Sequence, residues 1–328
     1  RQVGHLIARV ICISLFYQNP IGFFFSILFE TLPRRLFMTF NNNENTRVWF
    51  ITGASSGLGY EFTKKALESG EKVVGVARNI EKLNELKCQF EGMLLPLSLD
   101  VTDRSAVSTT VETAIKHFGR LDIVINNAGN MVMGMIEEFS EDEVRSQMET
   151  NFFGTVWVSQ AVMPYLRAQE SGHIIQISSI GGLISGPMSG IYSASKFALE
   201  GFSEALAQEA AHFGIKVSIV EPGGYWTNLY LKMSFTTQKK EYDSLREKLA
   251  QQYSNESVDS DPKLAAEAIM KLVNSENPPL RLVLGSLVYD LAVENAEKRI
   301  FTWKEWESVS RSSEHGIPAP EGYGIIEE

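Results

Sequence analysis

The feature that most limits the fold of this chain is a regular alternation of short apolar runs with helix-forming stretches. From Arg47 onward, each run rich in Val, Ile and Leu is followed by a longer segment with apolar residues at helical spacing. Strands that are apolar throughout are buried on both faces, and strands that alternate with helices form parallel βαβ units. The chain is therefore predicted to be an α/β protein with one doubly wound parallel sheet of about seven strands and helices on both faces. The runs are VWFIT, KVVGVA, MLLPLSLDV, LDIVINNAG, HIIQISS, IKVSIVEPGG and LRLVLG.

The sequence divides into a leader and one predicted domain. Residues 38–328 keep one β/α rhythm, with no Pro- or Ser-rich linker, which predicts a single domain. The polar segment 227–261 interrupts that rhythm, and we interpret it as a helical lid, because ligands bind beyond the carboxyl ends of such strands. Residues 1–37 are interpreted as a leader outside the fold, with a natural start at Met38. A membrane anchor is the alternative, although the uninterrupted apolar run 21–29 is far shorter than the roughly 20 residues of a spanning helix.

Charge and cysteine content exclude several classes of partner. The formal net charge is −10 and the pI is about 5.2, which argues against nucleic acid or an anionic membrane surface as a partner. The two cysteines, Cys12 and Cys88, cannot form a disulfide framework, which favours a reducing, cytoplasmic compartment. The five histidines lie far apart in sequence, and no Cys/His/Asp spacing indicates a metal site.

A glycine-rich turn, TGASSGLG, follows the first apolar run and opens the first helix. Gly53, Gly57 and Gly59 would let the backbone turn tightly and approach a pyrophosphate. The N-terminus of the helix adds unpaired N–H groups and the positive end of a dipole. The position between strand and helix predicts a dinucleotide site of the Rossmann type.

The same letters allow a competing interpretation. They contain the pattern G-x-S-x-G, in which Ser55 would be the nucleophile of a serine hydrolase. A hydrolase needs an acid and then a histidine further along the chain, for which His173 and His212 are the candidates. This alternative leaves the other motifs of the chain unexplained.

The end of the second apolar run, VARN, bears on the choice of cofactor. In NAD-binding proteins an acidic residue at this point hydrogen-bonds the ribose 2′-hydroxyl. Here Ala77 stands in that place and Arg78 follows, whose guanidinium would bind a 2′-phosphate bidentately. The sequence therefore favours NADP(H) over NAD(H).

Two tyrosines precede a lysine by four residues, in YEFTK and YSASK. This spacing puts both side chains on one helical face. Tyr60 and Lys64 have no serine at a strand end before them, and we interpret them as a packing or surface pair. Thirteen residues before Tyr192 stands Ser179, at the end of an apolar run. We interpret Tyr192 and Lys196 as a proton donor beside a cation, which lowers the pKa of a phenol.

These motifs make the sequence resemble the short-chain dehydrogenase/reductase family from about residue 47 to residue 224. TGASSGLG matches the family's T-G-x-x-x-G-x-G, and LDV, NNAG, METNFFG, ISSIGG, YSASK and EPGG follow in the family's order. A narrower resemblance is to bacterial 17β-hydroxysteroid-dehydrogenase-like NADP-dependent oxidoreductases, although Trp226 and Asn228 stand where such relatives more often carry Arg and Asp. The cofactor contacts that the resemblance implies are Thr52, Gly53, Ser55, Ser56, Gly57, Leu58, Gly59, Arg78, Asp100, Val101, Asn127, Ala128, Gly129, Tyr192, Lys196, Pro222, Gly223 and Thr227.

The resemblance implies hydride transfer between a nicotinamide and a carbonyl or alcohol carbon. Tyr192 would be the general acid in carbonyl reduction and the general base in alcohol oxidation. Lys196 would shift the pKa of that tyrosine and hold the ribose. Ser179 would hydrogen-bond the substrate oxygen, and Asn151 would hold a water that passes protons toward Lys196. Ser178 is interpreted as structural.

The resemblance also implies a small-molecule substrate and a homodimer or homotetramer. Apolar side chains near the expected mouth of the site predict a hydrophobic ketone or alcohol as substrate. A membrane-anchored sterol or lipid ketone reductase is the alternative. The apolar residues in question are Met131, Met133, Met135, Ile184, Met188, Tyr225 and Trp226.

Overall fold

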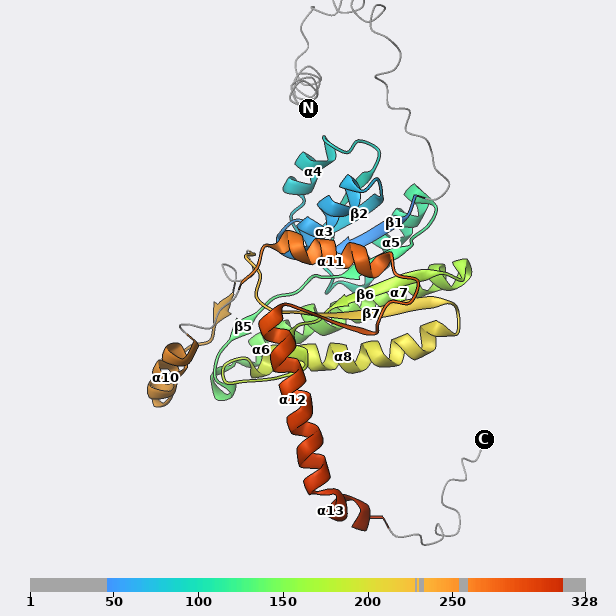
Figure 1. Cartoon of the computed structure of the whole chain (residues 1–328). Coiled ribbons are helices and arrows are strands. Elements are labelled where there is room, and N and C mark those ends of the chain that lie inside the picture. Colours follow the sequence, from blue (N-terminus) through green and yellow to red (C-terminus); the bar gives the residue numbers. More distant parts are fainter. Residues whose placement is uncertain (1–45, 228, 230–232, 254–258, 315–328) are drawn as a thin grey trace, which may run out of the picture.

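The computed structural model describes residues 46–227, 229, 233–253 and 259–314, so the predicted leader and Asn228 lie outside the described residues. The described strands form a seven-stranded parallel sheet in the order β3-β2-β1-β4-β6-β7-β9 (Figure 1). The α/β prediction and the parallel sheet are confirmed. The strands are β1 (Val48–Thr52), β2 (Lys72–Ala77), β3 (Leu94–Ser98), β4 (Ile123–Asn126), β6 (Gly172–Ile177), β7 (Ile215–Pro222) and β9 (Arg281–Leu284).

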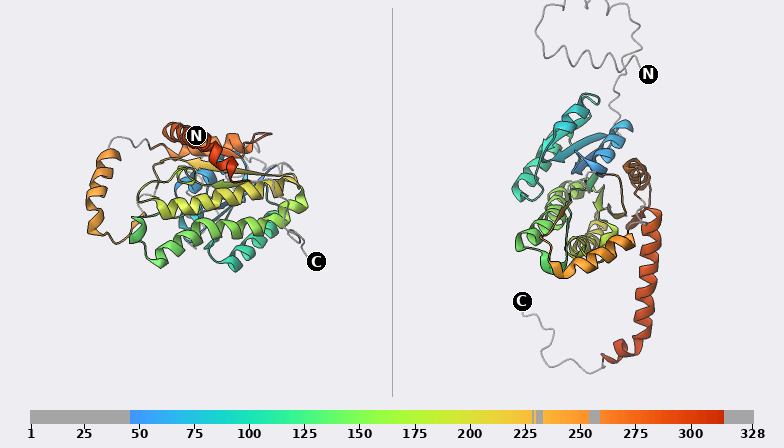
Figure 2. Two further views of the ribbon diagram at one scale, coloured as in Figure 1. Left: turned by 90° about the horizontal axis from the view of Figure 1, so that it is seen from below. Right: turned by 90° about the vertical axis from the view of Figure 1, so that its left-hand side faces the viewer.

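Helices cover both faces of the sheet because each strand is apolar on both sides. In β1, Trp49 and Ile51 point into one core, whereas Val48 and Phe50 point into the other. The first core is closed by helices α3 (Gly57–Glu68), α4 (Glu81–Lys87) and α11 (Pro262–Val273). The second is closed by α5 (Arg104–Phe118), α7 (Gly154–Gln169) and α8 (Gly190–Ala211), as the two further views show (Figure 2).

The strand order reverses next to β1, where β2 lies on one side and β4 on the other. Helices that start on opposite faces of the sheet diverge at such a point and leave a crevice beyond the carboxyl ends of the strands. Every strand of this sheet is parallel to its neighbours, so all carboxyl ends lie along one edge. The fold therefore places its ligand crevice above β1 and β4.

A long helical region follows Ser140 and contains a change of helix type. Ser140 and Glu143 form a reciprocal capping box at the start of α6 (Glu141–Met148). A π-helical turn, η3 (Glu149–Phe153), then separates α6 from α7. The chain stays helical through this turn, which directs the Asn151 side chain inward. Single π turns of this kind are frequent at functional sites.

A small two-stranded parallel sheet, absent from the sequence prediction, joins the predicted lid to the body. It pairs β5 (Val132–Met133) with β8 (Ser234–Phe235). The buried Glu138, in the 3₁₀ turn η2 (Ile136–Glu138), accepts hydrogen bonds from Lys239 N (2.8 Å) and Arg246 (2.7 Å). The described part of segment 227–261 further contains the 3₁₀ turn η5 (Lys240–Tyr242) and the helix α10 (Asp243–Tyr253).

After β9 the chain forms a long helix that leaves the body of the fold. In Figure 1, α12 (Ser286–Glu305) and the short α13 (Glu307–Ser312) extend past α8. Within the described residues, no helix is both long and apolar enough to cross a bilayer.

Candidate active site

A cleft of about 410 Å³ opens beyond the carboxyl ends of the strands, at the predicted edge of the sheet. Side chains and backbone from the turns after β1, β2, β3, β4, β6 and β7 all contribute to its wall. Most residues predicted to contact a cofactor lie in this lining. They are Gly53, Ser55, Ser56, Gly57, Leu58, Arg78, Asp100, Val101, Asn127, Ala128, Gly129, Tyr192, Lys196, Pro222, Gly223 and Thr227.

The glycine turn has the backbone conformation that its sequence predicts. Gly53 and Gly57 have φ angles of 65° and 56°, which glycine adopts at no steric cost. The third glycine, Gly59, packs against backbone instead. A Cβ at this position would stand 2.4 Å from Asn127 Nδ2 and 2.5 Å from Gly53 O. The turn therefore needs all three glycines, two for conformation and one for close approach.

Two residues expected in contact with the cofactor, Thr52 and Gly59, lie behind the cleft wall and outside its lining. The Thr52 hydroxyl accepts hydrogen bonds from the N–H groups of Asn127 and Ala128, both at 2.9 Å. The Asn127 amide donates in return to Thr52 O at 2.9 Å. These bonds tie the ends of β1 and β4 together, so Thr52 sets the shape of the cleft floor.

The groups that line the cleft fit a dinucleotide. The first N–H groups of a helix have no intrahelical acceptor. Within the described part of the chain, the Ser56 side chain makes no capping hydrogen bond to α3, so these N–H groups remain available at the cleft. The missing Cβ atoms of Gly53 and Gly57 let a phosphate approach this backbone. Arg78 lines the same cleft at the end of β2.

Tyr192 and Lys196 both line the cleft from the first turns of α8. The Lys196 Nζ atom lies 5.9 Å from the centre of the Tyr192 ring and donates to Ile177 O at 2.9 Å. Burial lowers the pKa of Lys196 to about 8, an effect that the nearby Glu200 carboxylate opposes. Helical spacing therefore places a buried cation beside the phenol.

Ser179 faces the tyrosine across a glycine. Its hydroxyl accepts a hydrogen bond from Gly181 N at 3.0 Å, in the 3₁₀ turn η4 (Ile180–Gly182). A Cβ on Gly181 would lie 3.1 Å from Tyr192 Cε1 and 3.5 Å from Ser179 Oγ. A glycine at this position therefore keeps open the space between the serine hydroxyl and the tyrosine ring.

Asn151 lies one layer behind these groups and is 1% exposed. Its amide donates to Asn130 O (3.0 Å) and Ser195 Oγ (3.1 Å) and accepts from Asn130 N (2.9 Å). Ser195 in turn donates to Tyr192 O at 2.6 Å. The Asn151 side chain thus connects the cleft wall to the start of α8. Asn151 was expected to hold a water in the site, but it lies outside the cleft lining.

A buried acidic cluster lies behind Lys196 and was missed from the sequence. Glu221 is fully buried on β7, and its Oε1 lies 3.5 Å from Arg281 Nε. The same Arg281 Nε pairs with Glu200 Oε2 at 3.1 Å. Burial, reinforced by the Glu200 charge and opposed by Arg281, raises the pKa of Glu221 to about 8. The pattern EPGG carried this signal, since a glutamate inside an otherwise apolar strand must be buried with it.

We expect Glu221→Gln to change how stability depends on pH. Glu221 ionises near pH 8 in the folded protein but near about 4.3 in the unfolded chain. Between these values the folded state binds the extra proton, so the free energy of unfolding falls as pH rises, by up to about 1.4 kcal/mol per pH unit. Glutamine removes this slope. Urea unfolding at several pH values between about 5 and 8 measures it. Parallel curves for wild type and variant would contradict the assignment, and Glu204→Gln, at the exposed end of the cluster, is the control that should keep the slope.

We expect Gly59→Ala to destabilise the protein and weaken cofactor binding together. The added methyl group would overlap Asn127 Nδ2 and Gly53 O, and such overpacking costs about 1–3 kcal/mol. The matched control is Gly201→Ala on α8, where a Cβ meets nothing within 4 Å in the described part of the chain. That change should stabilise by about 0.5–1 kcal/mol. Thermal unfolding with and without cofactor gives both results, and a Gly59→Ala variant as stable as wild type would contradict the close packing.

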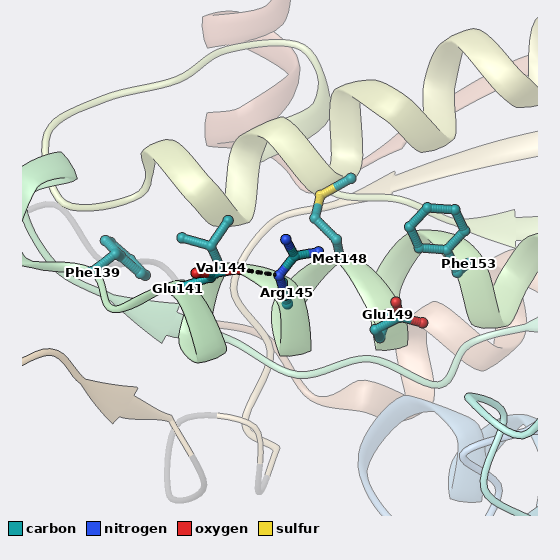
Figure 3. A pocket seen from close by; sticks show the side chains of 7 residues that line it. All are labelled: Phe139, Glu141, Val144, Arg145, Met148, Glu149 and Phe153. Atoms are coloured by element: carbon teal, nitrogen blue, oxygen red, sulfur yellow. Dashed lines mark hydrogen bonds and ion pairs between the residues drawn. The ribbon is translucent and has the colours of Figure 1, made fainter.

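A second hollow, of about 460 Å³, lies on α6 and η3 and shares no lining residue with the cleft (Figure 3). The guanidinium group in its lining is that of Arg145, which is already paired: Arg145 Nε lies 2.7 Å from Glu141 Oε1. The remaining lining is mainly apolar, from Phe139, Val144, Met148 and Phe153. Of these two hollows, the cleft is therefore the one that holds the candidate chemistry.

The structure also separates the residues of the hydrolase alternative. Ser55 follows the carboxyl end of β1, whereas His173 lies in the amino-terminal half of β6 and His212 follows the far end of α8. His173 is buried, its Nε2 lies 3.0 Å from Ser218 Oγ, and burial lowers its pKa to about 4. A serine–histidine pair cannot form across the sheet, so this interpretation is wrong.

The fold and the cleft together define a dinucleotide-binding oxidoreductase. The sequence profile of the short chain dehydrogenase family matches residues 47–238. The chain belongs to this family and is an NAD(P)-dependent oxidoreductase that acts on CH–OH and C=O groups. The family resemblance drawn from the motifs is confirmed.

Individual relatives support the same assignment. The chain is 39% identical over 272 residues to oxidoreductase BOA17 of Botryotinia fuckeliana (82% of this chain, 99% of the relative). It is 41% identical over 246 residues to a 3-ketodihydrosphingosine reductase of Bacteroides thetaiotaomicron (74% and 89%). A short-chain dehydrogenase structure from Streptomyces avermitilis superposes with a TM-score of 0.76 at 37% identity (83% and 100%). The narrower resemblance to 17β-hydroxysteroid-dehydrogenase-like enzymes stays a prediction.

Proposed function

We propose that this protein is an NADP(H)-dependent oxidoreductase that interconverts hydrophobic ketones and alcohols, with Tyr192 as general acid and base. The observation that carries the proposal is the shared cleft, which brings the glycine turn, Arg78 and the Ser179–Tyr192–Lys196 group to one edge of the sheet. Its test is a panel of apolar ketones and alcohols followed by NADPH absorbance. If the protein turns over hydrophilic carbonyl compounds and shows no turnover of apolar ones, the substrate assignment is overturned.

The roles of the chain's own groups follow from their positions. The nicotinamide, when bound, supplies or accepts the hydride. The glycine turn and the first amides of α3 would hold the phosphates, and Lys196 would bind ribose hydroxyls. Tyr192 would give its phenolic proton to the carbonyl oxygen in reduction and take it back in oxidation. Ser179 would donate to that same oxygen, since its hydroxyl lies beside the tyrosine ring.

The preference for NADP(H) rests on the end of β2. Ala77, Arg78 and Asn79 line the cleft there. With alanine in the position of the ribose-binding acid, no carboxylate at this strand end repels a 2′-phosphate, and Arg78 is a cation that can pair with it.

Arg78→Ala should weaken NADPH binding by about tenfold or more and leave NADH binding nearly unchanged, because only NADPH loses a charge-assisted bond. Fluorescence titration of both cofactors measures the two changes. Arg145→Ala on the exposed surface of α6 is the control and should change neither. Equal losses for NADPH and NADH in Arg78→Ala would remove the 2′-phosphate contact from the proposal.

The substrate side of the cleft supports an apolar ligand. Of the apolar residues singled out in the sequence, Met131 and Tyr225 line the cleft, and Leu229 joins them. Trp226 is 67% exposed and lies outside the lining. A lipid ketone is the second candidate substrate, favoured by the name of the relative from Bacteroides thetaiotaomicron. Comparing ketones of increasing chain length in the same assay distinguishes the two.

The organisation of the chain enters the same proposal. We infer a single catalytic domain over 38–328, in which segment 227–261 is a substrate lid, supported by its β8 strand and the contacts of Glu138. We further infer cytoplasmic location and a homo-oligomer. Fractionation of the full chain against a chain starting at Met38 tests whether the leader is a membrane anchor.

A further inference from the structure

The helix α12 carries an apolar stripe on a face that is exposed in the structure. Its members recur at alternating spacings of four and three residues, which keeps them on one side of a helix. The stripe is Tyr289 (58% exposed), Val293 (41%), Ala296, Ile300 (46%) and Trp303 (67%). Such a large exposed apolar surface, repeated in this register, is typical of a helix that packs against another helix.

The stripe is distinct from the side by which α12 is held to the body. Val288 is buried and packs over Gly223, and a Cβ on Gly223 would lie 2.7 Å from Val288 Cγ1. About two and three turns further along the helix, Asn295 and Arg299 donate to Leu183 O at 3.4 Å and 3.0 Å. At about 100° per residue, these anchors lie roughly a quarter turn away from the stripe. The helix is therefore fixed along one side and open along the other.

We propose that the stripe pairs antiparallel with the same stripe on a second copy of this chain, about a two-fold axis near Ala296. In this arrangement Tyr289 meets Trp303 of the second copy, and Val293 meets Ile300. The small Ala296 lies at the crossing, where two helices approach most closely. A two-fold contact requires a surface that is complementary to itself, and this order of large, medium and small side chains meets that requirement.

The charges beside the stripe favour the second copy as the occupant and fix the direction of pairing. Asp290 and Lys304 each follow a stripe residue on the side away from the body. Antiparallel pairing about Ala296 brings Asp290 of one copy next to Lys304 of the other, and symmetry repeats this pair. Parallel pairing would instead place Asp290 beside Asp290 and Lys304 beside Lys304, which are like charges. Glu297 is the exception, because the two copies of its carboxylate meet near the axis.

Charge reversal on the full chain tests the proposal by sedimentation. Lys304→Glu should weaken the dimer by about tenfold or more, because it places like charges together at both ends. The double variant Asp290→Lys/Lys304→Glu should restore the wild-type dimer, and Glu297→Gln should tighten it. The proposal would be overturned if the wild type associates and none of the three variants changes that association. It would also be overturned if the wild type is a monomer, which is the result expected if another segment of the same chain covers the stripe.

Cross-linking gives the geometry independently of any other interface. With Cys12 and Cys88 replaced by serine, Ala296→Cys should form a disulfide between copies under mild oxidation, because residues on the axis bring their Cα atoms within about 7 Å. Lys298→Cys, on the opposite side of α12, is the matched control and should stay reduced. Equal cross-linking at both positions, or none at Ala296→Cys, would reject pairing through this stripe.

Discussion

Changing Tyr192 to Phe should reduce turnover by about 10²- to 10⁴-fold, the usual contribution of a positioned general acid or base. The phenol ring packs against Gly181, and phenylalanine keeps that contact while removing the hydroxyl. NADPH binding should remain close to that of wild type, because the glycine turn and Arg78 are unchanged. Stopped-flow reduction of an apolar ketone gives the rate, and fluorescence titration gives the affinity.

The chain provides a matched control for this variant. Tyr60 precedes Lys64 by the same four residues, but Tyr60 packs on the hydrophobic core of α3, and Lys64 pairs with Glu68 at 3.9 Å. Tyr60→Phe should therefore leave turnover within about twofold of wild type, as surface and packing changes of this size usually do. If Tyr192→Phe retained turnover, another group would have to supply the proton and the proposed mechanism would fall.

The fold could be predicted because its signals are local and repeated. The runs that became β1, β2 and β6 are apolar on both faces, and a parallel sheet covered by helices is the arrangement that buries both. The glycine turn was equally readable, since the φ angles of Gly53 and Gly57 exclude most other residues. Such features depend on a few neighbouring residues and therefore leave a clear pattern in the sequence.

The side-chain contacts within the site could not be predicted in the same way. Asn151 lies one layer behind the cleft, and its bonds to Asn130 and Ser195 depend on a π turn within a helical region. The pair β5 and β8 brings together residues about one hundred positions apart, and each strand is only two residues long. Contacts between distant and very short elements leave no periodic signal.

The electrostatics of the site were only half visible from the sequence. Helical spacing placed Lys196 beside Tyr192, yet the depth of its burial depends on the whole cleft. The pairing of Glu200 with Arg281 joins α8 to β9 across 81 positions of sequence. The Glu200 carboxylate of this cluster favours the charged form of Lys196, so it stabilises the cation that lies beside Tyr192. Removing that cation therefore separates the chemistry of the site from its packing.

Lys196→Met should lower turnover by about 10²-fold or more while leaving the fold intact. Methionine matches the length of the buried stem but has no charge, so the phenol loses its neighbouring cation and the ribose loses a donor. The lost bond to Ile177 O costs about 1 kcal/mol, which relief from burying a charge offsets. Lys64→Met, in the second Tyr–Lys pair, is the control and should keep full turnover.

The dependence of stability on pH identifies the lysine as the buried charge that the variant removes. The pKa of Lys196 is about 8 in the folded protein and about 10.4 in an unfolded chain. Between these values the unfolded state binds the extra proton, so wild-type stability gains up to about 1.4 kcal/mol per pH unit relative to Lys196→Met. If Lys196→Met is more stable to unfolding than wild type, the difference in free energy of unfolding should be greatest below pH 8 and shrink toward pH 10. Denaturant unfolding of both proteins across this range measures the difference, and a constant difference would show that the lysine is not desolvated in the folded state.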